Sequence, residues 1–172
     1  MGTGTGFIAL TLHIIKTIIP TFNPQIYASD ILLEAIDLAK KNAERNNFLE
    51  QIEFIHSDLF HSFPESLQHS LDVIIFNPPY LPSIKNSIYK RTEDRSWDGG
   101  EQGFEVFIDF LNQIPDFLHS TESRIYYIYS SGVELTKLYS LIEQKGFKNT
   151  ILERRHIFME DIFLNRLQLK DD

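Results

Sequence analysis

The chain has 172 residues, of which 42% are apolar and 13% are aromatic, a composition typical of one globular domain of roughly 100 to 200 residues. Its formal charge of -8 and pI near 5.2 argue against sequence-independent binding to nucleic acid, which needs a basic surface. Cysteine is absent, which excludes disulfides and thiolate metal sites. We expect a single domain over residues 1–172 that acts on a protein or a small molecule.

The longest apolar stretch, FIALTLHIIKTII at residues 7–19, is interrupted by His13 and Lys16. It is shorter than the about 20 residues that a membrane-spanning helix needs. No basic segment precedes it, as one would in a signal peptide. We therefore predict a soluble, cytoplasmic protein without a membrane partner, with the nucleus as an alternative if the source is eukaryotic.

Strand-like and helix-like segments alternate along the chain, which predicts an α/β fold with a mostly parallel sheet covered by helices on both faces. The predicted helices cover residues 7–19, 30–46, 103–118 and 133–145. The predicted strands cover residues 25–29, 52–57, 71–76, 124–130, 147–157 and 161–169. The last two form an antiparallel hairpin with Met159 and Glu160 between them.

Two of these segments carry further information. The unbroken apolar run LDVIIF at residues 71–76 is typical of a strand at the centre of a sheet. The polar stretch 83–102 is long for a connection inside a compact domain, which indicates a functional or mobile segment.

The opening, MGTGTGFIAL, has the form of a glycine turn between a strand and a helix, yet no strand precedes it. In a doubly wound sheet that strand is central, so its loss would leave unpaired backbone groups in the core. We expect the chain to be a fragment that lacks the first strand, or Met1 to be an internal methionine.

The glycines at positions 2, 4 and 6 would let the backbone approach a ligand closely. Asp30 follows the predicted strand 25–29 and lies 24 residues after Gly6 (30 − 6). This is close to the spacing of about 20 residues at which an acid reaches the hydroxyls of a ribose. The alternative is that Asp30 only caps the helix 30–46.

Asp58 follows the strand 52–57, where its carboxylate could accept a hydrogen bond from an adenine amino group while Leu59 or Phe60 covers the ring. The alternative is a solvated loop acid. The glycine turn, Asp30 and Asp58 all lie at the carboxyl ends of successive strands, where open α/β sheets bind ligands.

The segment NPPYLP follows directly on the strand 71–76. The amide oxygen of Asn77 and the carbonyl of Pro78 can together accept both hydrogens of a substrate NH2 group and so aim the nitrogen lone pair at an electrophilic carbon. The two prolines hold the backbone in one extended course. Tyr80 would stack on the flat group that is modified. A plain turn with two prolines is the alternative.

Four motifs in this order resemble the HemK family of protein N5-glutamine methyltransferases: GTGTGFIAL, YASDILLEAIDLAKKNAERN, HSDLF and FNPPYLP. The resemblance runs from Gly2 to about residue 150. The segment SWDGGEQGFEVFIDFL at residues 96–111 is more similar to the eukaryotic and archaeal branch. That branch methylates the glutamine of the Gly-Gly-Gln loop of class I translation termination factors.

The resemblance implies a Rossmann-like class I methyltransferase fold and S-adenosylmethionine as the cofactor. It assigns the cofactor to Gly2, Thr3, Gly4, Thr5, Gly6, Asp30, Ile31, Asp58, Leu59 and Asn77. It assigns the catalytic positions to Asn77, Pro78, Pro79 and Tyr80, and the substrate to Asn77, Pro78, Tyr80 and Trp97. The alternative role for Trp97 is to anchor the loop to the body of the protein. The acidic strand end and the N-terminal segment that precede the glycines in the family have no counterpart before Gly2.

Members of that branch work with a small zinc-binding activator protein, which implies a heterodimer here. We expect residues 52–57 to be the edge strand that pairs with it. Apolar bulk around this strand would come from Phe48, Ile52, Phe54 and Phe60. The alternative is that these side chains pack inward under a helix.

The stretch 84–97 contains Lys85, Lys90, Arg91 and Arg95 and forms either a substrate contact or a solvated loop. The six histidines show no ligand spacing, so we expect no metal site.

Three other functions remain open. A DNA or RNA amino-methyltransferase would also use an Asn-Pro-Pro-aromatic site, but usually with a recognition domain or a basic face. A truncated, non-catalytic remnant could still bind the activator. A nicotinamide-dependent oxidoreductase leaves residues 77–80 unexplained.

Overall fold

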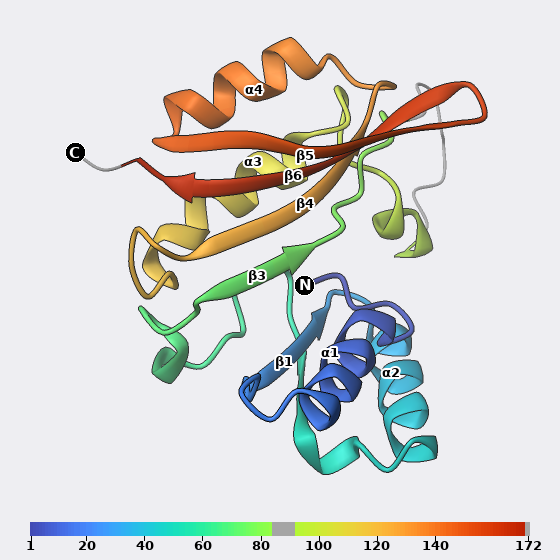
Figure 1. Cartoon of the computed structure of the whole chain (residues 1–172). Helices are drawn as coiled ribbons and strands as arrows, with labels where there is room; N and C mark the ends of the chain where they lie inside the picture. Colours follow the sequence, from blue (N-terminus) through green and yellow to red (C-terminus); the bar gives the residue numbers. More distant parts are fainter. Residues whose placement is uncertain (84–91, 171–172) are drawn as a thin grey trace. The chain divides into compact units, whose positions relative to one another are not determined.

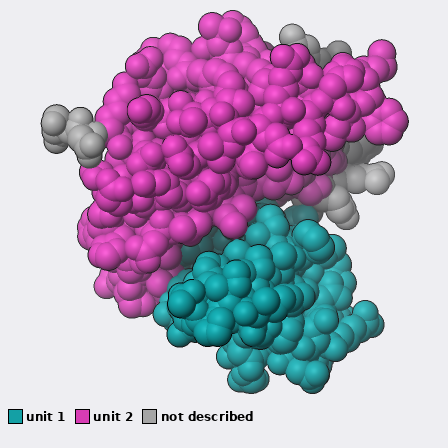
Figure 2. Space-filling model, in the orientation of Figure 1, with its two compact units in different colours: residues 1–63 teal, residues 64–172 magenta. Residues whose placement is uncertain are grey.

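The computed structural model describes residues 1–83 and 92–170. The chain divides into two compact units, residues 1–63 and 64–172, coloured separately in Figure 2. Each unit is described by itself below. Within the described residues, no helix is both long and apolar enough to cross a membrane.

Unit 1 consists of two helices and a two-stranded parallel sheet (Figure 1). Its elements are α1 (Phe7–Ile18), β1 (Ile26–Asp30), α2 (Leu33–Arg45), the 3₁₀ turn η1 (Leu49–Gln51) and β2 (Ile52–His56). The register runs from Ile26 opposite Ile52 to Asp30 opposite His56. Ala9 of α1 packs with apolar residues of both strands in a small core.

Unit 2 contains a four-stranded sheet in the order β3-β4-β6-β5. Its strands are β3 (Val73–Phe76), β4 (Arg124–Ser130), β5 (Phe147–Ile157) and β6 (Glu160–Leu169), and its helices are α3 (Glu105–Gln113) and α4 (Leu135–Gln144). The 3₁₀ turns are η2 (Glu65–Leu67), η3 (Thr92–Ser96) and η4 (Ile114–Asp116). β3 runs parallel to β4, whereas β6 is antiparallel to both β4 and β5. The parallel pairs β1–β2 and β3–β4 and the antiparallel hairpin β5–β6 agree with the prediction of a mostly parallel sheet that ends in an antiparallel hairpin.

Aromatic rings form much of the core of unit 2. Phe107 of α3 stacks on Tyr127 of β4 at a centroid distance of 4.5 Å, and Phe76 of β3 lies 4.9 Å from Phe110. Each of these four side chains is buried. Because α3 presents Phe107 and Phe110 on one face, it fixes the end of β3, from which residues 77–80 leave.

Several predicted boundaries are corrected. The helix predicted at 103–118 begins at Glu105 and gives way to η4 at Ile114, because Pro115 removes an amide donor and cannot continue an α-helix. The helix predicted from residue 30 begins at Leu33. The hairpin turn is Phe158–Met159 rather than Met159–Glu160, because β6 already begins at Glu160.

The prediction of a central strand at residues 71–76 is wrong for the described part of the chain. The strand covers only Val73–Phe76, and β4 is its one partner there. Ile74 and Phe76 are buried while Val73 is 55% exposed. Such alternation is what a strand with only one fully covered face shows.

Candidate active site

The glycine turn opens unit 1 and holds three left-handed residues, Gly2, Gly4 and Gly6, with φ of 64°, 51° and 82°. A Cβ at Gly6 would lie 3.1 Å from the Cβ of Ala39, so this glycine allows α1 to begin close against α2. A Cβ at Gly4 would meet no atom within 4 Å. Gly4 therefore borders open space, and its φ is the reason that it is glycine.

Asp30 ends β1 and holds this turn in place. Its Oδ2 accepts a hydrogen bond from the backbone amide of Gly4 at 2.9 Å, and its Oδ1 accepts one from the amide of Leu32 at 3.0 Å. The cap residue of α2 is Leu32, without a side-chain cap, so the alternative of Asp30 as the helix cap is wrong. Each carboxylate oxygen has a second lone pair, which leaves Asp30 able to accept from a ligand hydroxyl.

The end of β2 lies beside Asp30. The amide of Ser57 donates to the Asp30 carbonyl at 2.9 Å. The next residue, Asp58, therefore lies with Asp30 at the carboxyl ends of the two strands. Asp58 is exposed and Leu59 is buried. Leu59 has φ of 47°, a backbone conformation that is uncommon for a residue with a side chain and often marks ligand sites.

The remaining predicted cofactor residues of unit 1 act here through their backbones. The amide of Thr3 donates to the carbonyl of Ser29 at 2.9 Å. The carbonyl of Thr5 accepts from the side chain of Asn42 at 2.9 Å, and the carbonyl of Ile31 lies 3.0 Å from His56 Nε2. The turn, the end of β1 and the end of β2 are thus joined by hydrogen bonds within one unit.

These residues fit S-adenosylmethionine. The space next to Gly4 leaves the turn open to a ligand, and an acid that can accept hydroxyl bonds follows β1. A second, exposed acid follows β2 with a buried Leu59 beside it. The assignment of individual residues to the methionine, ribose and adenine parts stays a prediction.

In unit 2, residues 77–80 leave the carboxyl end of β3. Asn77 is exposed, and in the part of the chain that the structure describes its side chain has no hydrogen-bond partner. Pro78 is buried, whereas Pro79 and Tyr80 are half-buried. The ring of Tyr80 lies 5.9 Å from that of Tyr129 of β4. The Asn77 amide is therefore available for a ligand, and its catalytic role stays a prediction.

Trp97 is half-buried, and its carbonyl accepts a hydrogen bond from the amide of Leu81 at 3.0 Å. Its backbone thus anchors the chain that follows Tyr80, and a contact of its ring with substrate stays a prediction. Of the predicted basic patch, Lys85, Lys90 and Arg91 lie outside the described residues, and Arg95 is exposed in η3.

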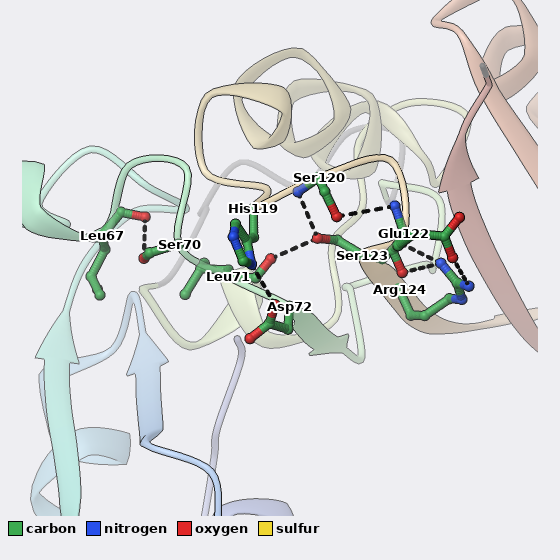
Figure 3. A network of polar contacts seen from close by, with 9 residues as sticks. All are labelled: Leu67, Ser70, Leu71, Asp72, His119, Ser120, Glu122, Ser123 and Arg124. Carbon is green, nitrogen blue, oxygen red and sulfur yellow. Dashed lines mark hydrogen bonds and ion pairs between the residues drawn. The ribbon is translucent and has the colours of Figure 1, made fainter.

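Another group of polar side chains lies at the opposite, amino ends of β3 and β4 (Figure 3). His119 Nδ1 lies 2.9 Å from Asp72 Oδ1, and Ser123 Oγ donates to the carbonyl of Leu71 at 3.0 Å. Because ligands in open α/β sheets bind at the carboxyl ends of the strands, we interpret this network as a structural connection. No three metal-ligating side chains gather anywhere in residues 1–83 and 92–170.

Asp98, Gly99 and Gly103 contact the segment after Asn77 and were not among the predicted site residues. The signal was the glycine-rich run WDGGEQG at residues 97–103. Paired glycines with no periodic pattern around them can mark a close backbone approach.

Residues 1–92 match the model of the methyltransferase small domain family. The chain belongs to this family. The match begins at the glycine turn and extends past residues 77–80, so it covers both candidate segments.

Two relatives within the methyltransferases are similar over much of the chain. A protein of Methanocaldococcus jannaschii with the provisional name protein N5-glutamine methyltransferase is 30% identical over 95% of this chain and 77% of its own length. The release factor glutamine methyltransferase of Bacillus anthracis is 32% identical over 69% of this chain. The alignment spans only 41% of that relative's length.

Among solved structures, the fold is similar to the E. cuniculi Mtq2-Trm112 complex, described as responsible for methylation of the eRF1 translation termination factor. The TM-score is 0.67 at 22% identity, and the match covers 98% of this chain and 81% of the other. At this identity the likeness establishes the methyltransferase fold, which confirms the predicted fold class.

Proposed function

We propose that the chain transfers a methyl group from S-adenosylmethionine to the side-chain amide nitrogen of a glutamine in a class I release factor. The observation that carries the proposal is the exposed Asn77 amide, which has no partner among residues 1–83 and 92–170 and is followed by two prolines at the end of β3. The names of the relatives support glutamine as the acceptor.

The chemistry requires that a planar, weakly nucleophilic amide nitrogen be aligned with an electrophilic carbon. S-Adenosylmethionine supplies a methyl group on a positively charged sulfur. We assign to the Asn77 Oδ1 and the Pro78 carbonyl the two acceptor positions for the hydrogens of the glutamine NH2. Holding both hydrogens reduces the conjugation of the nitrogen and aims its lone pair, so positioning and electrostatics carry the catalysis. The glutamine nitrogen would bond to the methyl carbon as the carbon–sulfur bond breaks, with that bond's electron pair left on the sulfur, and one of the two NH2 protons would pass to solvent.

Unit 1 would hold the cofactor in this proposal. The open space beside Gly4 and the acceptor oxygens of Asp30 and Asp58 lie at the joined carboxyl ends of β1 and β2. The carboxylate of Asp30 serves two purposes, because it fixes the amides of Gly4 and Leu32 and retains acceptor capacity for a hydroxyl pair.

The test compares acceptors with cofactor labelled in its methyl group. We expect label on a class I release factor and none on the same factor with the Gly-Gly-Gln glutamine replaced by alanine. DNA and RNA serve as competing acceptors. Label on nucleic acid alone would favour an exocyclic-amine methyltransferase. Binding of the activator without any transfer of label would favour a non-catalytic remnant.

We further propose that β2 pairs with a small zinc-binding activator protein. The similar solved structure is itself a complex, of Mtq2 with Trm112, which supports a protein partner here. Within the described residues β2 pairs with β1 alone, so its other edge offers main-chain groups to a partner. The apolar side chains do not add to this edge: Ile52 and Phe60 are buried, and Phe48 and Phe54 pack on the core.

Hydrogen exchange of the β2 amides with and without the activator tests this pairing. Strand addition would slow exchange at alternate amides of Ile52–His56, whereas docking elsewhere would leave their exchange unchanged. The matched reference is β5, the edge strand of the other sheet, whose exchange we expect to stay constant.

A further inference from the structure

The segment that follows residues 77–80 is bound to the glycine-rich run 97–103. The amide of Leu81 donates to the carbonyl of Trp97 at 3.0 Å, and the amide of Gly99 donates back to the carbonyl of Leu81 at 2.9 Å. The amide of Ser83 donates to the carbonyl of Gly100 at 2.7 Å. A short parallel bridge thus joins the two pieces of chain, with Leu81 opposite Asp98.

The carboxylate of Asp98 reinforces this bridge. Its Oδ1 accepts from the hydroxyl of Ser83 at 2.5 Å and from the amide of Gly100 at 2.9 Å. One oxygen atom therefore ties the outgoing chain to the glycine pair. A hydrogen bond to a charged acceptor is stronger than one between neutral groups.

Two glycines bring the backbone of this run against the carbonyls of residues 79 and 80. A Cβ at Gly99 would lie 2.5 Å from both the Pro79 and the Gly103 carbonyl oxygens, and one at Gly103 would lie 2.8 Å from the Tyr80 carbonyl oxygen. Gly99 does not have a left-handed backbone conformation. Glycine is therefore required there only because the two stretches of backbone lie so close together. No side chain can be added without moving a backbone.

The run is itself fixed to the core of unit 2. The carbonyl of Gly103 accepts a hydrogen bond from the hydroxyl of Tyr129 at 3.3 Å. Burial, and then the nearby Glu105 carboxylate, raises the pKa of Tyr129, so this hydroxyl keeps its proton. Glu105 of α3 also accepts from the amides of Gln102 and Phe104 at 3.1 and 3.2 Å.

We propose that Asp98, Gly99 and Gly103 are positioning residues that fix the course of residues 79–81 and thereby the direction of the Asn77 and Pro78 oxygens. Such contacts are needed because two consecutive prolines have no N–H group with which to form a backbone hydrogen bond. Their position must therefore be fixed by the chain that follows them and by backbone packed against their carbonyl groups. This inference rests on the proposed methyl transfer.

The experiment uses the full chain and the Gly99→Ala variant, with Gly132→Ala as the matched control. Gly132 also lies in unit 2 outside the left-handed region, and a Cβ there would meet only the side chains of Ser130, at 3.1 Å, and Glu160. We expect Gly99→Ala to lower the rate at saturating cofactor by roughly 10- to 100-fold, because displacements near 1 Å cost that much. The cofactor Kd should change less than about threefold, because Kd reports ground-state binding of the cofactor and Gly99 lies outside the residues assigned to the cofactor.

A second pair of variants keeps the inference testable if Gly99→Ala does not fold. Asp98→Ala removes the acceptor for Ser83 and Gly100, whereas Asp98→Asn retains an oxygen at the same place. We expect the rate to fall in Asp98→Ala and to recover most of its value in Asp98→Asn. A role limited to overall stability would lower the midpoint of unfolding without this recovery of rate.

Exchange of the Leu81 and Ser83 amides, followed by NMR, separates this inference from the proposed function. Faster exchange in Gly99→Ala and Asp98→Ala, with Gly132→Ala unchanged, would support positioning even if the wild-type chain transfers no methyl. Wild-type rate and unchanged exchange in both variants would overturn the inference while leaving the methyltransferase proposal intact.

Discussion

The two units hold their candidate segments by different means. In unit 1 a single carboxylate, that of Asp30, receives the amides of Gly4 and Leu32. In unit 2, Pro78 and Pro79 have no N–H group to donate. Backbone contacts with residues 97–103 restrain the chain that follows residues 77–80. The glycine turn is thus fixed through its own N–H groups, whereas residues 77–80, two of which have no N–H, are restrained through the chain that follows them.

We propose that the two units have separate tasks. The glycine turn with Asp30 and Asp58 would determine how tightly the cofactor binds, and residues 77–80 would determine how fast the bound cofactor reacts. Variants in unit 1 should therefore change mainly the cofactor Kd, and variants in unit 2 mainly the rate at saturating cofactor.

The largest effect is expected for Asn77→Ala. Loss of one acceptor that acts in the transition state should lower the saturated rate by about 100- to 1000-fold. Because Asn77 is exposed and lacks a side-chain partner in the described residues, the midpoint of urea unfolding should stay constant. A rate within threefold of wild type would remove Asn77 from the mechanism. The saturated rate is measured as single-turnover methyl transfer to a release factor.

Asp30→Ala should come next. It removes the acceptor of two backbone amides and the expected partner of the ribose, so we expect the cofactor Kd to rise by roughly 10- to 100-fold, or about 1.4 to 2.8 kcal/mol. Calorimetry with S-adenosylmethionine measures this change. The control is Asp37→Ala, an exposed acid of α2, for which the Kd should not change.

Gly6→Ala should destabilise unit 1 by about 1 to 2 kcal/mol in free energy of unfolding, since an alanine in the left-handed region is strained and would also press on Ala39. Gly4→Ala is the matched comparison, because it shares the positive φ but faces open space. Urea unfolding should show the smaller loss for Gly4→Ala. Equal losses would mean that contact with α2 contributes nothing.

The smallest effect is expected for Tyr129→Phe, which deletes the hydroxyl that donates to the Gly103 carbonyl. We expect a loss of about 1 kcal/mol in stability and a modest decrease in saturated rate. The control is Tyr126→Phe in the same strand, whose half-buried ring makes no hydroxyl bond in the described chain. A larger loss for the control would place the stabilisation elsewhere in β4.

Much of the fold could be predicted from hydrophobic patterns, because local spacing determines which face of a segment is buried. The strands 124–130 and 147–157 agree with the observed bounds. The end of α3 was predicted too far along the chain, although Pro115 was a local signal against it. The edge position of β3 was not predictable from its own residues, because it depends on which strand pairs beside it.

In the candidate site, too, features that depend on local residue types could be predicted, whereas features that depend on contacts between distant segments could not. Asn77 and the glycines carry chemistry in their own residue types, so the sequence alone points to them. That Asp30 holds the turn rather than capping α2 depends on the pairing of β1 with β2. The hold on residues 79–81 depends on contacts with Gly99 and Gly103 across the intervening loop, and no periodic pattern reports such contacts.

The separation of tasks is tested most directly by a double-mutant cycle of Asp30→Ala and Asn77→Ala, with cofactor Kd and saturated rate measured for all four proteins. We predict that the double variant has the Kd of Asp30→Ala and the rate of Asn77→Ala. If Asp30→Ala alone lowered the saturated rate as much as Asn77→Ala does, the assignment of binding to one unit and turnover to the other would be contradicted.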